Sequence, residues 1–120
     1  MSERMRFITH RGKKILLLDF SDCLENELEQ LIRTVPDIVA KQPRASVLIL
    51  VDYTRTTIDK ESLWVMKETA VFNKPYVRKS AWVRAESFPD VHRETLKSFS
   101  GRDFPTFKTR EDALEWLTVD

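Results

Sequence analysis

Two aspartates are the side chains whose positions most directly suggest chemistry. Asp19 follows the apolar run 15–18, and Asp52 follows the apolar run 47–51. Both runs are typical of buried strands, so the carboxylates are expected side by side at the carboxyl ends of neighbouring strands, where open α/β sheets bind ligands. Such a pair could hold Mg²⁺, with Lys108 facing it. The alternative is that both carboxylates accept hydrogen bonds from loop amides and helix N-termini.

A polar loop follows the second of these strands and is the strongest candidate for a binding site by position. It offers the hydroxyls of Thr54 and Thr56 and the guanidinium of Arg55 at the expected ligand edge. The next strand should bring Arg84 to the same edge. The alternative is an ordinary polar connection.

Residue types that bind metals or form covalent intermediates are scarce. His10 and His92 are the only histidines, and Cys23 is the only cysteine. Zinc needs three or four converging ligands, so no metal site is expected. Cys23 falls in the first turn of a predicted helix, whose dipole would lower the thiol pKa, but neighbouring acids oppose this effect. We assign no catalytic residue, and an enzyme is the least favoured function.

Composition excludes further classes of protein. The chain has 120 residues and only two glycines, Gly12 and Gly101, so it holds neither a P-loop nor a dinucleotide-binding fingerprint. The net charge of +1 shows none of the basic excess typical of nucleic-acid binding. One cysteine allows no intrachain disulfide, and no apolar run approaches the roughly 20 residues of a membrane-spanning helix. We expect one cytoplasmic domain over residues 1–120, without cofactor, nucleic acid or stable membrane insertion.

Hydrophobic periodicity predicts the elements that would position these side chains. Gly12 allows a hairpin between the first two strands, and the strand–helix alternation after it implies parallel pairs with right-handed crossovers. The predicted fold is α/β: a mixed five-stranded sheet in the order β-β-α-β-α-β-α-β-α, first strand antiparallel, with four helices. Strands are expected over 4–10, 15–20, 46–53, 76–84 and 104–107, and helices over 22–42, 59–72, 90–100 and from 109 onward.

The first predicted helix has the clearest apolar face. Asp22 is placed as its N-cap, and Glu25 completes a capping box. Pro36 falls inside the helix and should kink it near Ile32 or restart it. Side chains at spacings of four, three, four and three should form the buried face: Leu24, Leu28, Leu31, Val35 and Ile38. In the helix over 90–100, the inward residues should be Val91, Thr95, Leu96 and Phe99.

Several segments together resemble the bacterial SpoIIAA-like family. The family is related in fold to STAS domains, found in sulfate transporters and anti-sigma-factor antagonists, and to lipid-carrying Sec14-type domains. The resemblance covers nearly the whole chain and implies the same mixed sheet. It implies little about function, because most members are uncharacterised. The matching segments are FITHRGKKILLLDFS (7–21), KQP (41–43), VD (51–52), NKPYV (73–77) and SGRDFP (100–105).

The resemblance also bears on regulation by phosphorylation. In phosphoswitch members of the wider STAS superfamily, a serine that opens the helix after the third strand is phosphorylated by a partner kinase. Asp59 matches the aspartate before that serine, but the position itself falls on Lys60 or Glu61, and Ser62 comes slightly later. We therefore predict no efficient phosphorylation of Ser62.

Two functions follow from the resemblance, both by analogy at the level of the fold. The first is a non-enzymatic STAS-like module that binds a protein partner. The alternative is a carrier of a small or lipid-like apolar ligand, which an enclosed pocket beside Trp64, Met66 and Trp82 would favour.

Uneven charge along the chain further suggests self-association. Residues 19–37 carry a net charge of −5 and residues 74–110 a net charge of +5. A two-fold interface would bring each region to its complement twice, so we predict a homodimer. Trp64, Val65 and Phe72 on the second helix should supply its apolar centre.

Overall fold

The computed structural model describes residues 3–86 and 88–119, and five of its strands form one mixed sheet in the order β1-β2-β3-β4-β5. β1 (Met5–His10) pairs antiparallel with β2 (Lys13–Asp19), through a turn in which Gly12 has a φ of +77°. β3 (Val47–Asp52), β4 (Val77–Val83) and β5 (Thr106–Phe107) continue the sheet in parallel. The predicted α/β sheet with an antiparallel first strand is confirmed.

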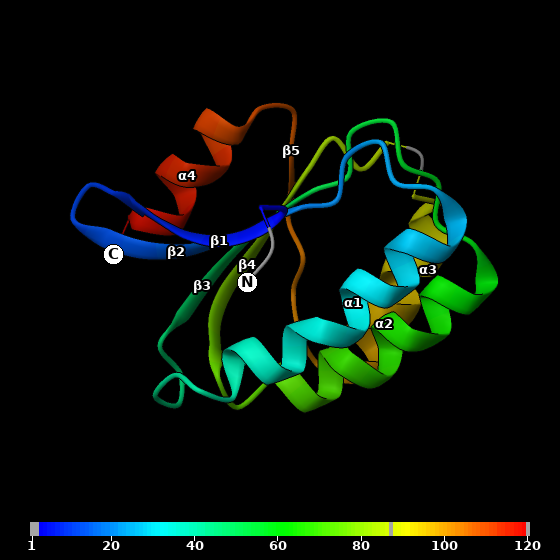
Figure 1. Ribbon diagram of the computed structural model, residues 1–120, viewed down its shortest axis with the longest axis horizontal. Coiled ribbons are helices and arrows are strands. Elements are labelled where there is room, and N and C mark those ends of the chain that lie inside the picture. The colour runs from blue at the N-terminus through cyan, green and yellow to red at the C-terminus, as the bar shows by residue number, and fades with distance from the viewer. Residues whose placement is uncertain (1–2, 87, 120) are drawn as a thin grey trace.

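Four helices cover the two faces of this sheet (Figure 1). The buried residues of β2 and β3, except Asp52 at the end of β3, are apolar on both sides, as in sheets covered on both faces. Leu16 and Leu18 belong to the core beneath three of the helices, whereas Ile15 and Leu17 belong to the core beneath the fourth. The three helices on one face are α1 (Glu25–Val39), α2 (Lys60–Asn73) and α3 (Asp90–Ser100), and the helix on the other is α4 (Arg110–Thr118).

The start of α1 differs from the prediction. Its N-cap is Leu24, without a side-chain cap, while Asp22 has a φ of +51° and pairs with Arg55. The predicted capping box at Asp22 is therefore wrong. The helix also continues through Pro36, so the predicted restart does not occur.

The buried face of α1 is rotated from the predicted one. Leu31 and Ile38 are only partly buried, and Leu24 is exposed. The difference arises because α1 packs against α2 as well as the sheet, which moves the centre of its apolar stripe by about one residue. The side chains buried along α1 are Leu28, Ile32, Val35 and Val39.

Helices α2 and α3 match the sequence-based prediction in part. In α2, Asp59 caps the helix by accepting from the Ser62 amide at 2.7 Å, as predicted. In α3, Leu96 is buried as expected, but Val91 and Phe99 are exposed, so their predicted inward orientation is wrong. α3 packs chiefly against α2, so only a narrow stripe of it is covered. Gly101 ends α3 with a φ of +69°, the expected left-handed cap.

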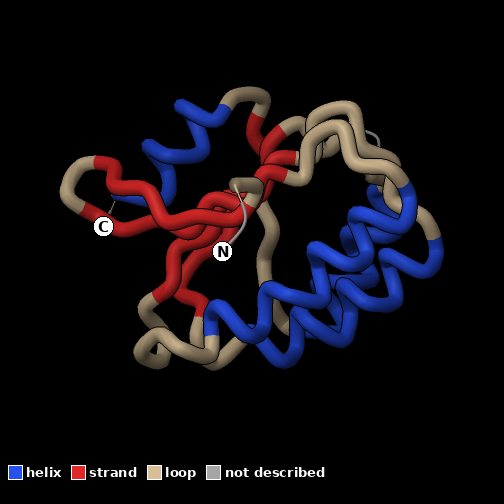
Figure 2. Tube along the Cα trace, viewed as in Figure 1, coloured by secondary structure: helices blue, strands red, loops and turns tan. Residues whose placement is uncertain are grey.

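The loops at the carboxyl ends of β2, β3 and β4 gather at one end of the molecule (Figure 2). Backbone hydrogen bonds join them, from the Asp22 amide to the Thr54 carbonyl and from the Tyr53 amide to the Val83 carbonyl. In the described residues, no helix has the length and apolar character needed to cross a membrane.

Candidate functional site

Asp19 and Asp52 are register partners on β2 and β3, so they do lie side by side. Each accepts hydrogen bonds from the amide and hydroxyl two residues later, at Ser21 and Thr54 respectively. The cation between them is Arg110 rather than the predicted Lys108. Its guanidinium lies 2.8 Å from the Asp52 carboxylate and 3.4 Å from that of Asp19.

These contacts leave few carboxylate oxygens at this edge free to bind a metal ion. Burial opposes ionisation of Asp19, but hydrogen bonds from Ser21 and the charge of Arg110 outweigh it and lower the pKa of this carboxyl. Within the described part of the chain, no three His, Cys, Asp or Glu side chains come together as a metal site. The aspartates instead fasten two loops and the start of α4 to the sheet.

The polar loop after β3 is held by contacts within the protein. Arg55 makes two hydrogen bonds to Asp22, at 2.6 and 2.8 Å, and this pairing lowers the pKa of Asp22. Thr56 is buried, and its hydroxyl donates to the Phe20 carbonyl at 2.5 Å. Arg84 reaches the same edge but pairs with Glu86 at 3.1 Å. Arg55 and Thr56 therefore tie the loops after β2 and β3 together.

The other reactive side chains that the sequence suggested include Cys23, His10 and Ser62. Burial, above all, raises the pKa of the Cys23 thiol. His10 pairs at the surface with Glu115 of α4, on the face opposite α1–α3. Ser62 is buried, and its hydroxyl has no hydrogen-bond partner in the described residues, which leaves it poorly placed for modification.

The outer side of the helical layer exposes several large apolar side chains. Trp64 is 62% exposed and Phe99 is 57% exposed, and the Lys67 ammonium lies 5.7 and 5.3 Å from their respective ring centres. Val65 is buried, so its predicted place in an exposed interface is wrong. We call the outer patch the exposed apolar residues of α2 and α3: Trp64, Val71, Phe72, Val91 and Phe99.

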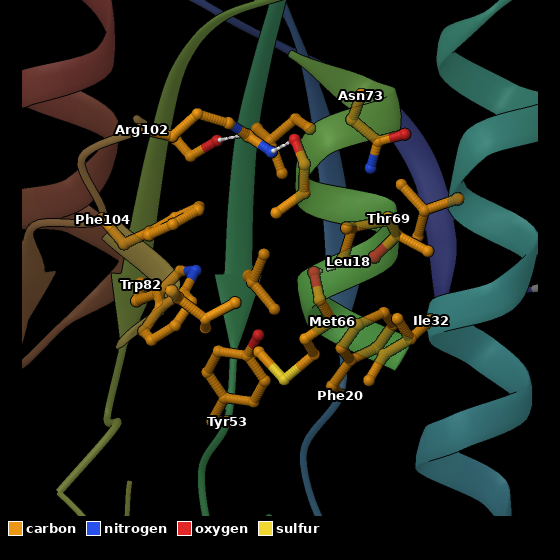
Figure 3. A pocket seen from close by; sticks show the side chains of 16 residues that line it. Leu18, Phe20, Ile32, Tyr53, Met66, Thr69, Asn73, Trp82, Arg102 and Phe104 are labelled. Carbon is orange, nitrogen blue, oxygen red and sulfur yellow. Dashed lines mark hydrogen bonds between the residues drawn. The ribbon is translucent and has the colours of Figure 1, made fainter. Parts of the chain in front are cut away.

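A cavity of about 70 Å³ lies between the sheet and the helical layer (Figure 3). Met66 and Trp82 line it, as the predicted pocket required, but Trp64 does not. Its walls are mostly apolar, with a polar group of side chains toward Arg102 and Asn73 and an aromatic group toward Tyr53 and Met66. The lining residues are Leu18, Phe20, Ile32, Val35, Ile49, Val51, Tyr53, Met66, Thr69, Ala70, Asn73, Ser80, Trp82, Leu96, Arg102 and Phe104.

Arg102 is the one charged group among these lining residues. Its guanidinium donates to the Ala70 carbonyl at 3.1 Å and to the Ser80 hydroxyl at 2.7 Å, and it lies 4.9 Å from the ring centre of Phe104. Among the described residues no carboxylate pairs with it, and the neighbouring Asp103 pairs with Lys97 instead. Burial lowers the pKa of Arg102 to about 10, so it stays charged at neutral pH.

Neutral polar side chains share the cavity wall with this cation, among them Tyr53 and Asn73. Tyr53 is buried edge-on to Trp82, with ring centres 5.1 Å apart, and burial raises the pKa of its hydroxyl so that it stays protonated. Asn73 has a buried carbonyl oxygen without a hydrogen-bond partner in the described residues. The charged and polar groups of the lining are thus one guanidinium, hydroxyls and an amide.

Sequence reasoning missed Arg102, Asn73 and Ser80 as site residues. Arg102 follows the glycine that ends α3, a place where an arginine is ordinarily exposed. No spacing rule identifies it, because it reaches the cavity only through the packing of α3 on α2.

Comparison with solved structures places the fold. The chain matches the crystal structure of an uncharacterized protein from the DUF3478 family with a SpoIIAA-like fold, from Shewanella loihica PV-4. The TM-score is 0.64, and the alignment covers 94% of this chain and 91% of that chain. This chain has a SpoIIAA-like fold. The sequence identity is 13%, so the likeness concerns the SpoIIAA-like fold alone. No protein-family model and no curated protein matches the chain.

Proposed function

We propose that this chain is a non-enzymatic SpoIIAA-like module that binds a small, largely apolar ligand between its sheet and helices α1–α3. The observation that carries the proposal is the mostly apolar cavity beside a partly buried cation that pairs with no carboxylate of the described residues. Apolar walls with a few convergent polar groups are typical of small-molecule sites.

The volume of the cavity sets the size of that ligand. About 15 Å³ of space open to a water-sized probe is enough for one water molecule. A space of about 70 Å³ therefore holds several water molecules or a short organic group. A longer ligand must displace a wall, and Met66 is the side chain that does so at least cost because methionine is unbranched and flexible.

Methyl NMR of the methionines gives a direct test, because Met66 lines the cavity and Met5 lies elsewhere in the same core. 1-Pentanol is a suitable neutral probe. At roughly 0.7 kcal/mol for each of its six non-hydrogen atoms, it should bind with a Kd of about 1 mM. We expect the labelled Met66 methyl signal to move on titration and the Met5 signal to stay fixed.

A matched pair of variants localises the binding. Ala70→Val adds two methyl groups to a residue that lines the cavity, whereas Ala85→Val adds the same groups to a buried residue outside it. The first should weaken binding of 1-pentanol, and the second should not. A Met66 signal that ignores the probe at concentrations well above 1 mM would contradict the proposal.

The outer patch supports a second candidate function, contact with a protein partner, including a second copy of this chain. Its side chains recur along α2 and α3 at the spacing of one helix face, and the exposed rings of Trp64 and Phe99 lie on either side of the Lys67 ammonium. Aromatic residues are enriched at the centres of protein interfaces.

A further inference from the structure

The hydrogen bonds of Arg102 leave part of its guanidinium without a protein partner. An arginine carries five N–H donors. Within the described residues, two hydrogen bonds are made, to the Ala70 carbonyl and the Ser80 hydroxyl, and both acceptors are neutral. A charge withdrawn from water is costly unless it is paired and hydrogen-bonded, so an anion at this point would be strongly favoured.

A second hollow leads from the surface to the same guanidinium. It has a volume of about 420 Å³, and Arg102 and Ser80 line both it and the cavity, so these two residues separate the two spaces. Its lining includes three further cations, Lys74, Arg78 and Lys79, and a single acid, Asp103. Clefts lined by one sign of charge concentrate ligands of the opposite sign.

Resting on the proposed function, we propose that the ligand is a carboxylate with an apolar tail, its head bound by Arg102 and its tail directed toward Met66. The planar guanidinium presents parallel N–H donors that match the two oxygens of a carboxylate. A carboxylate is also compact enough for a cavity of about 70 Å³, and the apolar walls beyond Arg102 exclude a second charge.

Arg102 also has a structural role that the test must separate from binding. Ala70 lies in the last turn of α2, where carbonyl groups lack helical partners and carry partial negative charge. The hydrogen bond from Arg102 therefore caps α2. Loss of this cap alone would lower stability, but it would not distinguish an acid from an alcohol of the same length.

The experiment compares pentanoate with 1-pentanol at pH 7, using the Met66 methyl signal as readout and Met5 as internal reference. We expect pentanoate to bind at least tenfold more tightly than 1-pentanol. Arg102→Met should abolish that preference, so that the two probes bind this variant equally. Arg102→Lys keeps the charge but loses the parallel N–H donors of the guanidinium, so it should retain part of the preference for pentanoate.

Lys41→Met is the matched control, because Lys41 is an exposed cation that lines neither the cavity nor the hollow beside Arg102. It should leave the preference for pentanoate unchanged. Sodium chloride should weaken binding of pentanoate and not of 1-pentanol. If Arg102→Met does not fold, the comparison of the two probes on the unaltered chain and on Arg102→Lys decides the question.

Each outcome has a definite consequence. Equal binding of the two probes overturns the carboxylate proposal and leaves the proposed function standing. Binding of neither overturns both. A preference for pentanoate that survives in Arg102→Met overturns the assignment to Arg102. If inorganic phosphate competes with 1-pentanol while pentanoate does not bind, the choice of a carboxylate is overturned.

Discussion

Two neighbouring residues of α1 allow a stringent test of how the helical layer is packed. The apolar spacing of the sequence predicts that Leu31 is buried, whereas in the structure Ile32 is 4% exposed and Leu31 is only partly buried. Replacing either residue by alanine removes three carbon atoms. At about 0.8 kcal/mol for each buried CH₂, the transfer free energy for Ile32→Ala is roughly 2.4 kcal/mol.

Ile32→Ala should cost more than that transfer energy, because the space it vacates adjoins the existing cavity and is refilled poorly. We expect a loss of about 3 kcal/mol in the free energy of unfolding, against about 1 kcal/mol for Leu31→Ala. Urea denaturation of both variants measures the difference, with the slope of each transition checked against the parent chain. Equal losses, or a larger loss for Leu31→Ala, would refute the orientation of α1.

Three further predictions concern other parts of the chain. Ser62→Ala should leave stability unchanged or raise it by up to about 1 kcal/mol, because the buried hydroxyl has no hydrogen-bond partner in the described residues, and thermal denaturation measures this. Mass spectrometry of protein from its native host should find no phosphate on Ser62. A hydrogen bond from His10, together with Arg11, lowers the pKa of Glu115. The stabilising effect of ionised Glu115 is therefore present above the ordinary carboxyl pKa and is lost as the pH falls through the lowered pKa. The difference in Tm between the parent and Glu115→Gln should shrink between pH 6 and pH 3, and a constant difference would contradict this prediction. Sedimentation at micromolar concentration should give about twice the chain mass, and Trp64→Glu should return the chain to a monomer; a dimer unaffected by Trp64→Glu would place the interface elsewhere.

The sheet could be predicted because local pattern and global position agree. The run Val47–Asp52 is apolar at every position except its last, as expected for a central strand covered on both faces. A two-residue turn at Gly12 fixes the hairpin, and the following strand–helix alternation permits little except parallel pairing. The orientation of the helices was harder to predict because it depends on which neighbours they contact. Val91 and Phe99 fit an inward stripe by spacing, yet α3 meets α2 rather than the sheet.

The candidate site, too, could be predicted from the sequence only in part. The adjacency of Asp19 and Asp52 follows from strand register, which the apolar runs define. The cation that pairs with them could not be predicted from the sequence, because Arg110 reaches them only through the position of α4. Sequence reasoning placed its strongest binding-site candidate at the carboxyl ends of the strands, whereas the cavity lies beneath the helices, where only the pocket expected for the ligand-carrier alternative, beside Trp64, Met66 and Trp82, pointed to it.

The two roles of Arg102 are compatible, and the geometry shows why capping alone is an incomplete account. A cap for the last turn of α2 requires one donor, and an exposed lysine or arginine from the solvent side could supply it. Here the guanidinium instead crosses the layer to the Ser80 hydroxyl, lies against Phe104 and forms the wall between a mostly apolar cavity and a basic groove. That route withdraws a charge from water, which a cap at the surface would avoid. The cost is offset if the remaining donors bind an anion that enters from the groove, and the difference between pentanoate and 1-pentanol measures that offset directly.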